Sequence, residues 1–308
     1  FSPDGQELTV ACDMSELFRS TDRGRHWDLV PHTRIQAGRA SAVRFSGNMR
    51  TTIDITAAAA RIVQSSDGLL WTHLPTQPPA DELYGVWVDP LRSGHILSES
   101  WGGIFSTLDG GSSWKSVWTP RNPDMGNRVG GAFWDGADVY VGSRDGLLVS
   151  HDSGKTFAIQ ATPGIPASQR IVAFSGGRRG GILKLFASTA DSGSVYGGMP
   201  VEELNGNLNW GLWTWSTGEA TWKAGMTGID PTDRLYLLGQ AGSSIDTLYA
   251  AGGHAQSDWP AIYGSVDGGA HWSGLLKAQG NLNVSPGWAG TGGDRDWSYG
   301  GMACGFAV

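Results

Sequence analysis

Three aspartates stand where turn carboxylates could act as a general acid and a general base. Asp13 and Asp258 each lie nine residues before the aspartate of a repeated turn motif, so they occupy equivalent turns of that repeat. Asp296, with Asp294 close to it, lies in the long segment 279–301. Two carboxyl groups can divide acid and base roles when burial or the partner's charge raises one of the two pKa values. We therefore expect Asp13 to form a catalytic pair with one of the others.

Tryptophan is frequent, with 15 residues, of which five close the repeated turns. Several of the others alternate with Asp, Asn and Arg in the expected loops. Sugar rings present apolar C–H faces and hydroxyl groups, so exposed indoles with polar neighbours suit them. The candidate substrate-binding residues are Trp101, Trp259, Trp288, Trp297, Asp145 and Glu99. The alternative for each is a tryptophan that packs between sheets or a solvated turn carboxylate.

An internal repeat determines which elements carry these residues. A motif of eight residues begins with Ser or Thr, has Asp at its third position and ends with Trp or Phe; it occurs at 20–27, 107–114, 150–157 and 265–272. Shortened copies lie at 65–71 and 216–222, the second without its Asp. Such an Asp can accept hydrogen bonds from turn amides, Gly permits a positive φ, and Trp anchors the turn. The aspartates that we expect to be structural are Asp22, Asp67, Asp109, Asp152 and Asp267.

The spacing of the repeat predicts the fold. The closing aromatic residues are separated by 44, 43, 43, 65 and 50 residues, and strand-like runs fill each interval, as at 41–45, 52–56, 61–64 and 71–74. Four strands in about 43 residues are typical of a β-propeller blade. We therefore predict an all-β, single-domain β-propeller of about six four-stranded blades over residues 1–308. The expected blades are 1–30 with 303–308, 40–75, 83–118, 129–161, 169–224 and 228–276, with the long loop 279–301 before the last strand.

The two ends of the sequence predict how the ring closes. Residues 8–12 are typical of the second strand of a blade and residues 303–308 of a first strand, so the C-terminal strand should complete the N-terminal blade and remove an open edge. When Leu8 faces Val308 in that antiparallel pair, Cys12 lies opposite Cys304. A disulfide there would suit a secreted protein. Two buried free thiols are the alternative.

The repeated turn resembles the Asp box, or BNR repeat, of the sialidase-like β-propellers, in which the box is structural. Residues 13–22, with the sequence DMSELFRSTD, are similar to the segment where glycoside hydrolase family 74, the xyloglucanases and related endo-β-glucanases, carries a catalytic Asp. The resemblance implies that Asp13 is a catalytic carboxylate in an inverting pair, spaced to admit a water molecule. That family builds its cleft between two seven-bladed propellers, and Ser15-Glu16 replaces its usual Gly-Gly here.

Composition argues against several other classes. The formal charge of −7 disfavours binding to nucleic-acid phosphates, and the sequence has no run of about 18 apolar residues that would indicate a transmembrane helix. The seven His lack a His-Glu-x-x-His pattern, and two Cys cannot form a Cys-rich zinc site. We expect no metal, no cofactor, and no nucleic-acid or membrane partner. A secreted or periplasmic protein that binds a polysaccharide or oligosaccharide fits these observations.

Three functions remain open from the sequence alone. The first is a glycoside hydrolase that cleaves a neutral polysaccharide such as a β-glucan or a xyloglucan. The second is a non-catalytic propeller, either a lectin or a scaffold for a protein partner. The third is a polysaccharide lyase, which needs a base such as His254 or Tyr263 and an arginine to neutralise a uronate.

Overall fold

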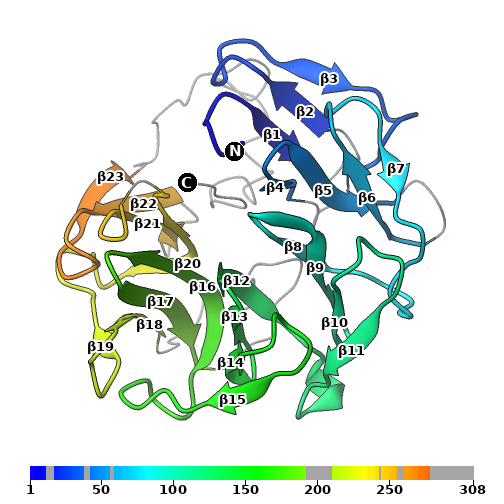
Figure 1. The fold of residues 1–308 in the computed structure, drawn as a ribbon. Helices are drawn as coiled ribbons and strands as arrows, with labels where there is room; N and C mark the ends of the chain where they lie inside the picture. The colour runs from blue at the N-terminus through cyan, green and yellow to red at the C-terminus, as the bar shows by residue number, and fades with distance from the viewer. Residues whose placement is uncertain are drawn as a thin grey trace. The chain divides into compact units, whose positions relative to one another are not determined.

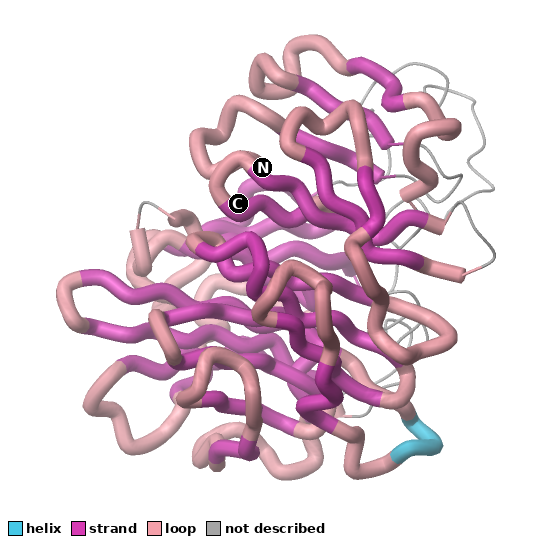
Figure 2. The backbone as a smooth tube through the Cα atoms, turned by 45° about the vertical axis from the view of Figure 1, so that its right-hand side comes forward, coloured by secondary structure: helices cyan, strands magenta, loops and turns pink. Residues whose placement is uncertain are grey.

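The computed structural model describes residues 1–11, 17–37, 42–55, 59–191, 210–242, 244–254 and 260–277. These residues form antiparallel strands, turns and one short 3-10 helix, η1 (Pro123–Met125), as Figures 1 and 2 show. Within these ranges, no helix is both long enough and apolar enough to span a bilayer. The predicted all-β class is confirmed.

The first of two compact units comprises residues 1–141 and 148–160. Its described strands belong to four antiparallel sheets. The first sheet contains β1 (Leu8–Ala11), β2 (Leu17–Ser20) and β3 (Asp28–Val30), and the second contains β4 (Arg44–Ser46), β5 (Met49–Asp54), β6 (Arg61–Ser65) and β7 (Thr72–His73). The third contains β8 (Gly85–Asp89), β9 (Arg92–Ser100), β10 (Gly103–Thr107) and β11 (Lys115–Trp118). The fourth contains β12 (Val129–Asp135), β13 (Asp138–Ser143), β14 (Gly146–Ser150) and β15 (Ala158–Gln160).

The second unit comprises residues 142–147, which are the end of β13, the turn after it and the start of β14, and residues 161–308. Its first sheet contains β16 (Arg170–Arg179), β17 (Ile182–Ala190), β18 (Trp210–Ser216) and β19 (Lys223–Ala224). The last contains β20 (Asp233–Gln240), β21 (Leu248–His254), β22 (Pro260–Ser265) and β23 (Ser273–Lys277). Each sheet consists of consecutive strands in sequence order, which is the organisation of a propeller blade. The predicted β-propeller class, with six blades, is confirmed.

Apolar clusters join consecutive sheets. Leu17 and Val30 of the first sheet pack with Val63 of the second, and Phe186 of β17 packs with Leu235 of β20. Alternating side chains of a strand point to opposite faces, so a central sheet buries residues on both faces. This explains why β8 and β10 are buried along their whole length.

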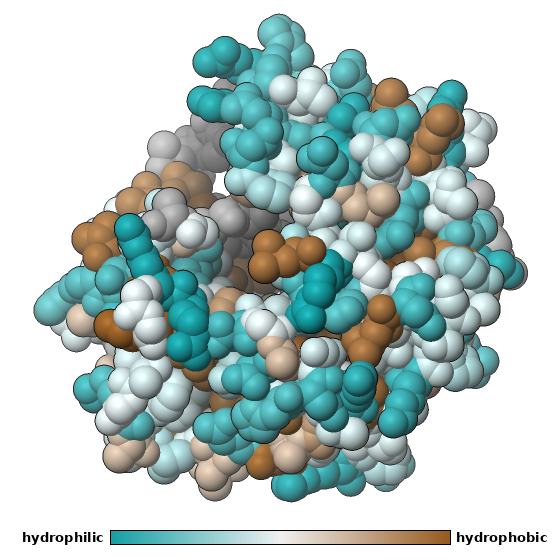
Figure 3. Space-filling model, in the orientation of Figure 1, coloured by the Kyte–Doolittle hydropathy of each residue, from teal (hydrophilic) through white to brown (hydrophobic). Residues whose placement is uncertain are grey.

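The surface between these sheet interfaces is mainly polar. On the face that Figure 3 shows, hydrophobic residues are scattered among hydrophilic ones. The exposed large hydrophobic side chains include Leu91 and Val266, which lie in turns far apart in the sequence. Single exposed residues of this kind are normal on a folded protein and indicate no binding surface by themselves.

The repeated Asp turns have the geometry that their sequence predicts. In the turn after β10, the Asp109 carboxylate accepts hydrogen bonds from the Ser113 amide at 2.9 Å and from the Thr107 hydroxyl at 2.7 Å. The same hydroxyl accepts from the Gly111 amide at 3.0 Å. Gly110 and Gly111 have φ of 69° and 80°, a region that favours glycine. The turn is therefore closed by its own side chains.

The turn after β18 lacks Asp but keeps a carboxylate in a similar role. The Ser216 amide donates to the Glu219 carboxylate at 3.0 Å, and the Trp215 indole donates to the Glu219 carbonyl at 3.0 Å. Glu219 comes three residues after Ser216, whereas Asp109 comes two residues after Thr107. The longer side chain compensates for the displaced position.

Low pH is expected to loosen these turns. Hydrogen bonds from Ser113 and Thr107 lower the pKa of Asp109 to about 2, and the Leu70 and Leu69 amides and the Ser65 hydroxyl lower that of Asp67 to about 2. The pKa of an unfolded aspartate is about 3.9, so this stabilisation is complete above that value and is lost as the pH falls towards 2.

Thermal midpoints of the wild type and of Asp109→Asn, followed by circular dichroism at pH 6 and pH 2, test this expectation. The wild type should lose more stability in acid than Asp109→Asn does. Asp124→Asn, an exposed aspartate outside the repeated turns, should behave as the wild type. Equal acid sensitivity of all three proteins would show that the turn carboxylates do not contribute.

The predicted ring closure falls outside the described residues, because Cys12, Cys304 and residues 303–308 all lie there. Among the described strands, the first sheet has three and β1 forms its edge, whereas every other sheet has four. A fourth strand alongside β1 therefore stays a prediction, as does the disulfide.

Peptide mapping of the unreduced protein tests the disulfide. We expect one linked pair of peptides that contains Cys12 and Cys304 and separates on reduction, and Cys12→Ser should abolish it and lower the thermal midpoint. Quantitative alkylation of both thiols in unreduced, denatured protein would instead favour two free cysteines.

Candidate functional site

The turn between β9 and β10 presents a half-exposed tryptophan. Trp101 is 53% exposed, and the strands on either side pair Ser100 with Gly103. A Cβ on Gly103 would lie 2.1 Å from the Trp118 carbonyl oxygen, and Gly103 has a φ of 147°, so this position requires glycine. The tight turn directs the indole outward from the end of two strands whose last and first residues, Ser100 and Gly103, are buried.

The segment that follows β11 fixes this indole. Its Nε1 donates to the Pro123 carbonyl of η1 at 3.1 Å, and the Asn127 amide donates to the Trp101 carbonyl at 2.9 Å. Gly126, with a φ of 64°, lies directly against the ring, because a Cβ there would be 2.5 Å from it. The ring is therefore held in one orientation while half of the residue stays exposed, as a stacking platform requires.

Glu99, two residues before Trp101, has a buried carboxylate. The residue is 2% exposed, and Glu99 Oε1 accepts from the Val129 amide at 2.9 Å. Its backbone carbonyl accepts from the Tyr84 amide at 2.8 Å. Glu99 therefore connects β9 to the segment before β8 and to the start of β12, so its geometry suits a residue that positions the Trp101 turn rather than one that contacts a ligand.

Asn127 is a polar residue that the sequence did not single out. It is 7% exposed, and its Nδ2 finds no acceptor in the described part of the chain. A buried donor without a partner is costly, and such groups usually bind a water molecule or a ligand. Because its amide is bonded to Trp101, Asn127 adds an unused hydrogen-bond donor next to the aromatic platform.

Tyr84 and Glu82 lie in the segment directly before β8, the first strand of the same sheet. The Tyr84 hydroxyl donates to the Glu82 carboxylate. This bond, together with burial and the charges of Glu82 and Glu99, raises the pKa of Tyr84 to about 12. Tyr84 is therefore a hydrogen-bond donor at neutral pH. Trp101 and Asn127 offer an apolar ring face and a side-chain amide, which can bind a sugar but are not a paired acid and base.

The second unit contains the predicted residue Asp145, in the β13–β14 turn. The Asp145 amide donates to the Ser143 hydroxyl at 3.2 Å, and that hydroxyl donates to the Gly146 carbonyl at 3.0 Å. Asp145 is partly exposed. The turn corresponds to that of Trp101, in which Ser100 makes the same bond to Gly103 at 3.4 Å.

The residues considered for a lyase also lie in the second unit. Tyr263 is buried, and its hydroxyl donates to Asp233 Oδ2 at 2.5 Å and accepts from the Asp230 amide at 3.2 Å. A hydroxyl used in this way is not placed to abstract a proton from a ligand. His254 is the last residue of β21. In the described ranges, no cluster of three or more His, Cys, Asp or Glu residues could hold a metal ion.

Most of the predicted catalytic and aromatic residues lie outside the described residues. They are Asp13, Asp258, Asp294, Asp296, Trp259, Trp288 and Trp297. Their roles therefore stay predictions.

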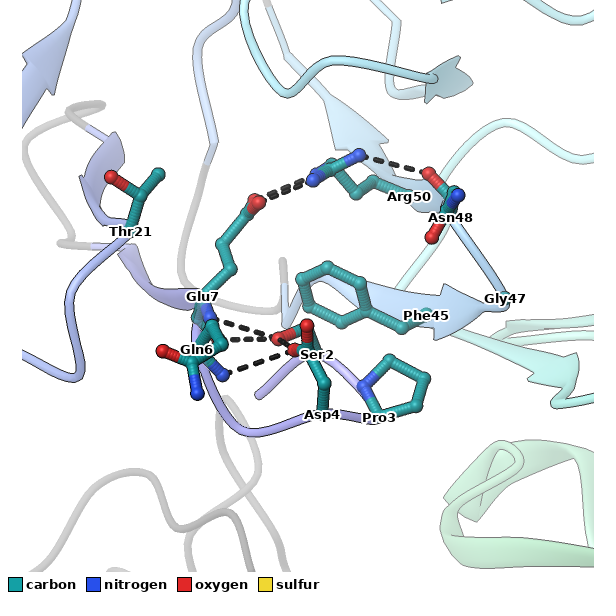
Figure 4. Close-up of a pocket in the computed structure, with 10 residues that line it drawn as sticks. All are labelled: Ser2, Pro3, Asp4, Gln6, Glu7, Thr21, Phe45, Gly47, Asn48 and Arg50. Carbon is teal, nitrogen blue, oxygen red and sulfur yellow. Dashed lines mark hydrogen bonds and ion pairs between the residues drawn. The ribbon is translucent and has the colours of Figure 1, made fainter.

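A pocket of about 250 Å³ lies beside the first two sheets (Figure 4). One wall contains Glu7, which is buried and accepts from Arg50 Nε at 2.6 Å and from Arg19 Nη2 at 2.9 Å. Burial raises the pKa of Glu7, but the hydrogen bonds from Arg50 and Arg19 outweigh it and hold that pKa below its usual range. The lining residues are Ser2, Pro3, Asp4, Gln6, Glu7, Thr21, Phe45, Gly47, Asn48 and Arg50.

Comparison with known proteins gives no match to a family model, and no curated protein matches the sequence. Solved structures are similar in fold. An ancestral GH74 enzyme is 17% identical with a TM-score of 0.67, over 90% of this chain and 38% of that one. The GH74 enzyme of Niastella koreensis is 15% identical with a TM-score of 0.56, over 87% and 44%. YCF48 bound to a D1 peptide is 16% identical with a TM-score of 0.52, over 89% and 80%.

These similarities show the propeller fold. The chain spans less than half the length of both GH74 enzymes, but most of YCF48. The fold is therefore shared with carbohydrate-active enzymes and with a protein whose structure contains a bound peptide.

Proposed function

We propose that this chain is a secreted, carbohydrate-active propeller that binds a neutral polysaccharide at the Trp101 turn. The observation that carries the proposal is the fixed, half-exposed indole of Trp101 next to the unpartnered amide of Asn127. The apolar ring face matches a C–H face of a pyranose, and the side-chain amide matches one of its hydroxyl groups. The similarity to GH74 structures favours a β-glucan or a xyloglucan as the ligand.

Hydrolysis is the further part of this proposal. Asp13 would act with a second carboxylate, Asp258 or Asp296, as acid and base. Reducing-sugar release from β-glucans and xyloglucan tests it directly. Binding without bond cleavage would favour a lectin, and an unsaturated product from a uronic-acid polymer would favour a lyase.

Replacement of Trp101 by Ala should abolish most of the polysaccharide binding. The indole supplies the stacking surface, and such contacts contribute about 1–3 kcal/mol each in comparable ring-stacking sites, so we expect affinity for xyloglucan to fall roughly tenfold or more. Isothermal titration calorimetry or affinity electrophoresis measures this.

Trp27→Ala is the matched control, because Trp27 is also half-exposed but closes the first Asp turn, at the other end of its strands from the position of Trp101 in its own sheet. Its affinity should equal that of the wild type. Equal losses of affinity in both variants would point to a general effect on folding. Unchanged affinity in Trp101→Ala would show that Trp101 does not bind the polysaccharide.

A protein-binding propeller is the second candidate. The extent of the match to YCF48 bound to a peptide favours it, because 80% of that chain is covered. If none of the tested polysaccharides binds, a peptide becomes the better candidate for the ligand of this propeller.

A further inference from the structure

The pocket beside the first two sheets is separate from the Trp101 turn. It is lined by the segment before β1, by Thr21 in the first Asp turn, and by Gly47 and Asn48 of the β4–β5 turn. In their sheets, these elements lie at the same end of the strands as the Asp turns. The β9–β10 turn with Trp101 lies at the opposite end of its own strands. A ligand in the pocket would therefore not contact the Trp101 platform.

One wall of this pocket is an aromatic ring in a fixed position. Phe45 lies between the Glu7–Arg50 pair and the segment that contains Pro3, as Figure 4 shows. The Arg50 guanidinium lies 5.5 Å from the centre of the Phe45 ring. Arg50 is itself held, because Nη1 donates to the Asn48 and Ser66 carbonyls at 2.8 Å each. The Arg50 guanidinium therefore lies near one side of the Phe45 ring, while Pro3 adds a second apolar surface to the pocket.

The rest of the lining is polar and has unused hydrogen-bonding groups. The Asp4 carboxylate uses Oδ1 to accept from the Ser2 hydroxyl and from the Gln6 amide. Within the described residues, Asp4 Oδ2, the Thr21 hydroxyl and the Asn48 side-chain amide make no hydrogen bond. The pocket therefore offers a charged acceptor, a hydroxyl and an amide around the aromatic wall.

Charge and size restrict the ligand. Arg50 and Arg19 both pair with Glu7, and the two guanidinium groups together with the carboxylates of Glu7 and Asp4 carry no net charge that would attract an ion. A volume of about 250 Å³ is below the range of roughly 300–1,000 Å³ that is typical of pockets for drug-sized ligands. A neutral molecule with an apolar ring face and several hydroxyls meets all of these conditions.

We propose that this pocket binds a single neutral pyranose, which stacks on Phe45 and donates a hydrogen bond from one hydroxyl group to the Asp4 carboxylate. The site goes beyond the proposed polysaccharide site, because it lies at the other end of the strands. It would hold one sugar unit or the end of a chain, without cleavage. The Thr21 hydroxyl and the Asn48 side-chain amide would form hydrogen bonds with further hydroxyl groups of the sugar.

Saturation-transfer NMR on the Trp101→Ala protein tests this proposal with the polysaccharide platform removed. D-Xylose and D-glucose should receive saturation in a concentration-dependent way. D-Sorbitol, which has the hydroxyls but no ring face, should receive much less. Absence of transfer to both sugars, or equal transfer to sorbitol, would overturn the proposal.

Variants of the pocket identify the site. Asp4→Asn should weaken sugar binding about tenfold, because it removes a hydrogen bond to a charged group, and Phe45→Leu should weaken it by a similar factor. Asn48→Ala, in an exposed turn, provides a variant that cannot disturb the core. The matched controls are Asp81→Asn and Phe18→Leu, both exposed and outside the pocket. Unchanged binding in Asp4→Asn and Asn48→Ala would place the sugar elsewhere.

This experiment does not depend on the proposed function. Loss of polysaccharide binding in Trp101→Ala, with retained monosaccharide binding, would support both sites. Retained polysaccharide binding in Trp101→Ala would contradict only the platform, and absent monosaccharide binding only the pocket.

Discussion

Glu7→Gln is expected to destabilise the protein by about 3–5 kcal/mol, the usual effect of removing one partner from a buried ion pair. The Glu7 carboxylate is buried and accepts from Arg50 and from Arg19. A neutral amide of the same shape leaves both guanidinium groups without their counter-charge. Glu7 directly precedes β1 and Arg50 lies on β5, so the loss would weaken the attachment of the first sheet to the second.

Urea unfolding with linear extrapolation measures this loss. Asp81→Asn, an exposed carboxylate of the same unit, should change the free energy of unfolding by less than about 0.5 kcal/mol. The difference between wild type and Glu7→Gln should also shrink in acid. The pKa of Glu7 is lowered by folding, so its stabilising effect is complete above about 4.3 and disappears as the pH falls through the lowered value. A loss below about 1 kcal/mol at pH 7 would contradict the assigned role.

Asp13→Asn is expected to lower the rate of polysaccharide hydrolysis by roughly a hundredfold to ten-thousandfold, the range that one general acid or base contributes. Asparagine keeps the size of the side chain but cannot exchange a proton. The expected loss is therefore in kcat, while polysaccharide binding through Trp101 is retained. Reducing-sugar release and calorimetric binding on the same preparation separate these two quantities.

Asp81→Asn is again the control, because that residue is outside every site proposed above and should retain full activity. If Asp13→Asn remains active, catalysis belongs to another carboxylate. If the wild type binds the glycan but releases no reducing sugar, the hydrolase part of the proposal is wrong and a lectin remains.

Much of the fold could be predicted, because its repeat is local. Asp109, Gly110 and Gly111 determine one turn through bonds that span only a few residues. Strand β6 was expected at 61–64 and is found at Arg61–Ser65. Strand β5 was expected from residue 52 but begins at Met49. Its first residues include Arg50, which is polar and yet buried because Glu7, distant in the sequence, neutralises it.

The candidate site could be predicted only in part. The sequence places Trp101 among the loop tryptophans, and the residue is 53% exposed in the β9–β10 turn, while its role as a sugar platform stays a proposal. The sequence also suggested that Glu99 contacts substrate, whereas its carboxylate is buried against the Val129 amide, thirty residues further along the chain. Neither this partner nor the unpartnered Asn127 amide has a local signal, since both depend on how one sheet meets the next.

Hydrogen bonds from two of the tryptophans that end the Asp turns bear on how the number of blades can change in evolution. Trp114 donates to the Thr76 carbonyl at 3.2 Å, and Trp272 donates to the Gly225 carbonyl at 2.9 Å. In each case the acceptor lies in the connection that leads into the tryptophan's own sheet. Residues 76–114 and 225–272 therefore each contain both the donor and the acceptor of this contact, and in repeat proteins stability is approximately a sum over neighbouring units. Duplication or deletion of one such segment as a whole would preserve this hydrogen bond. The number of blades can therefore change in evolution without the loss of this contact.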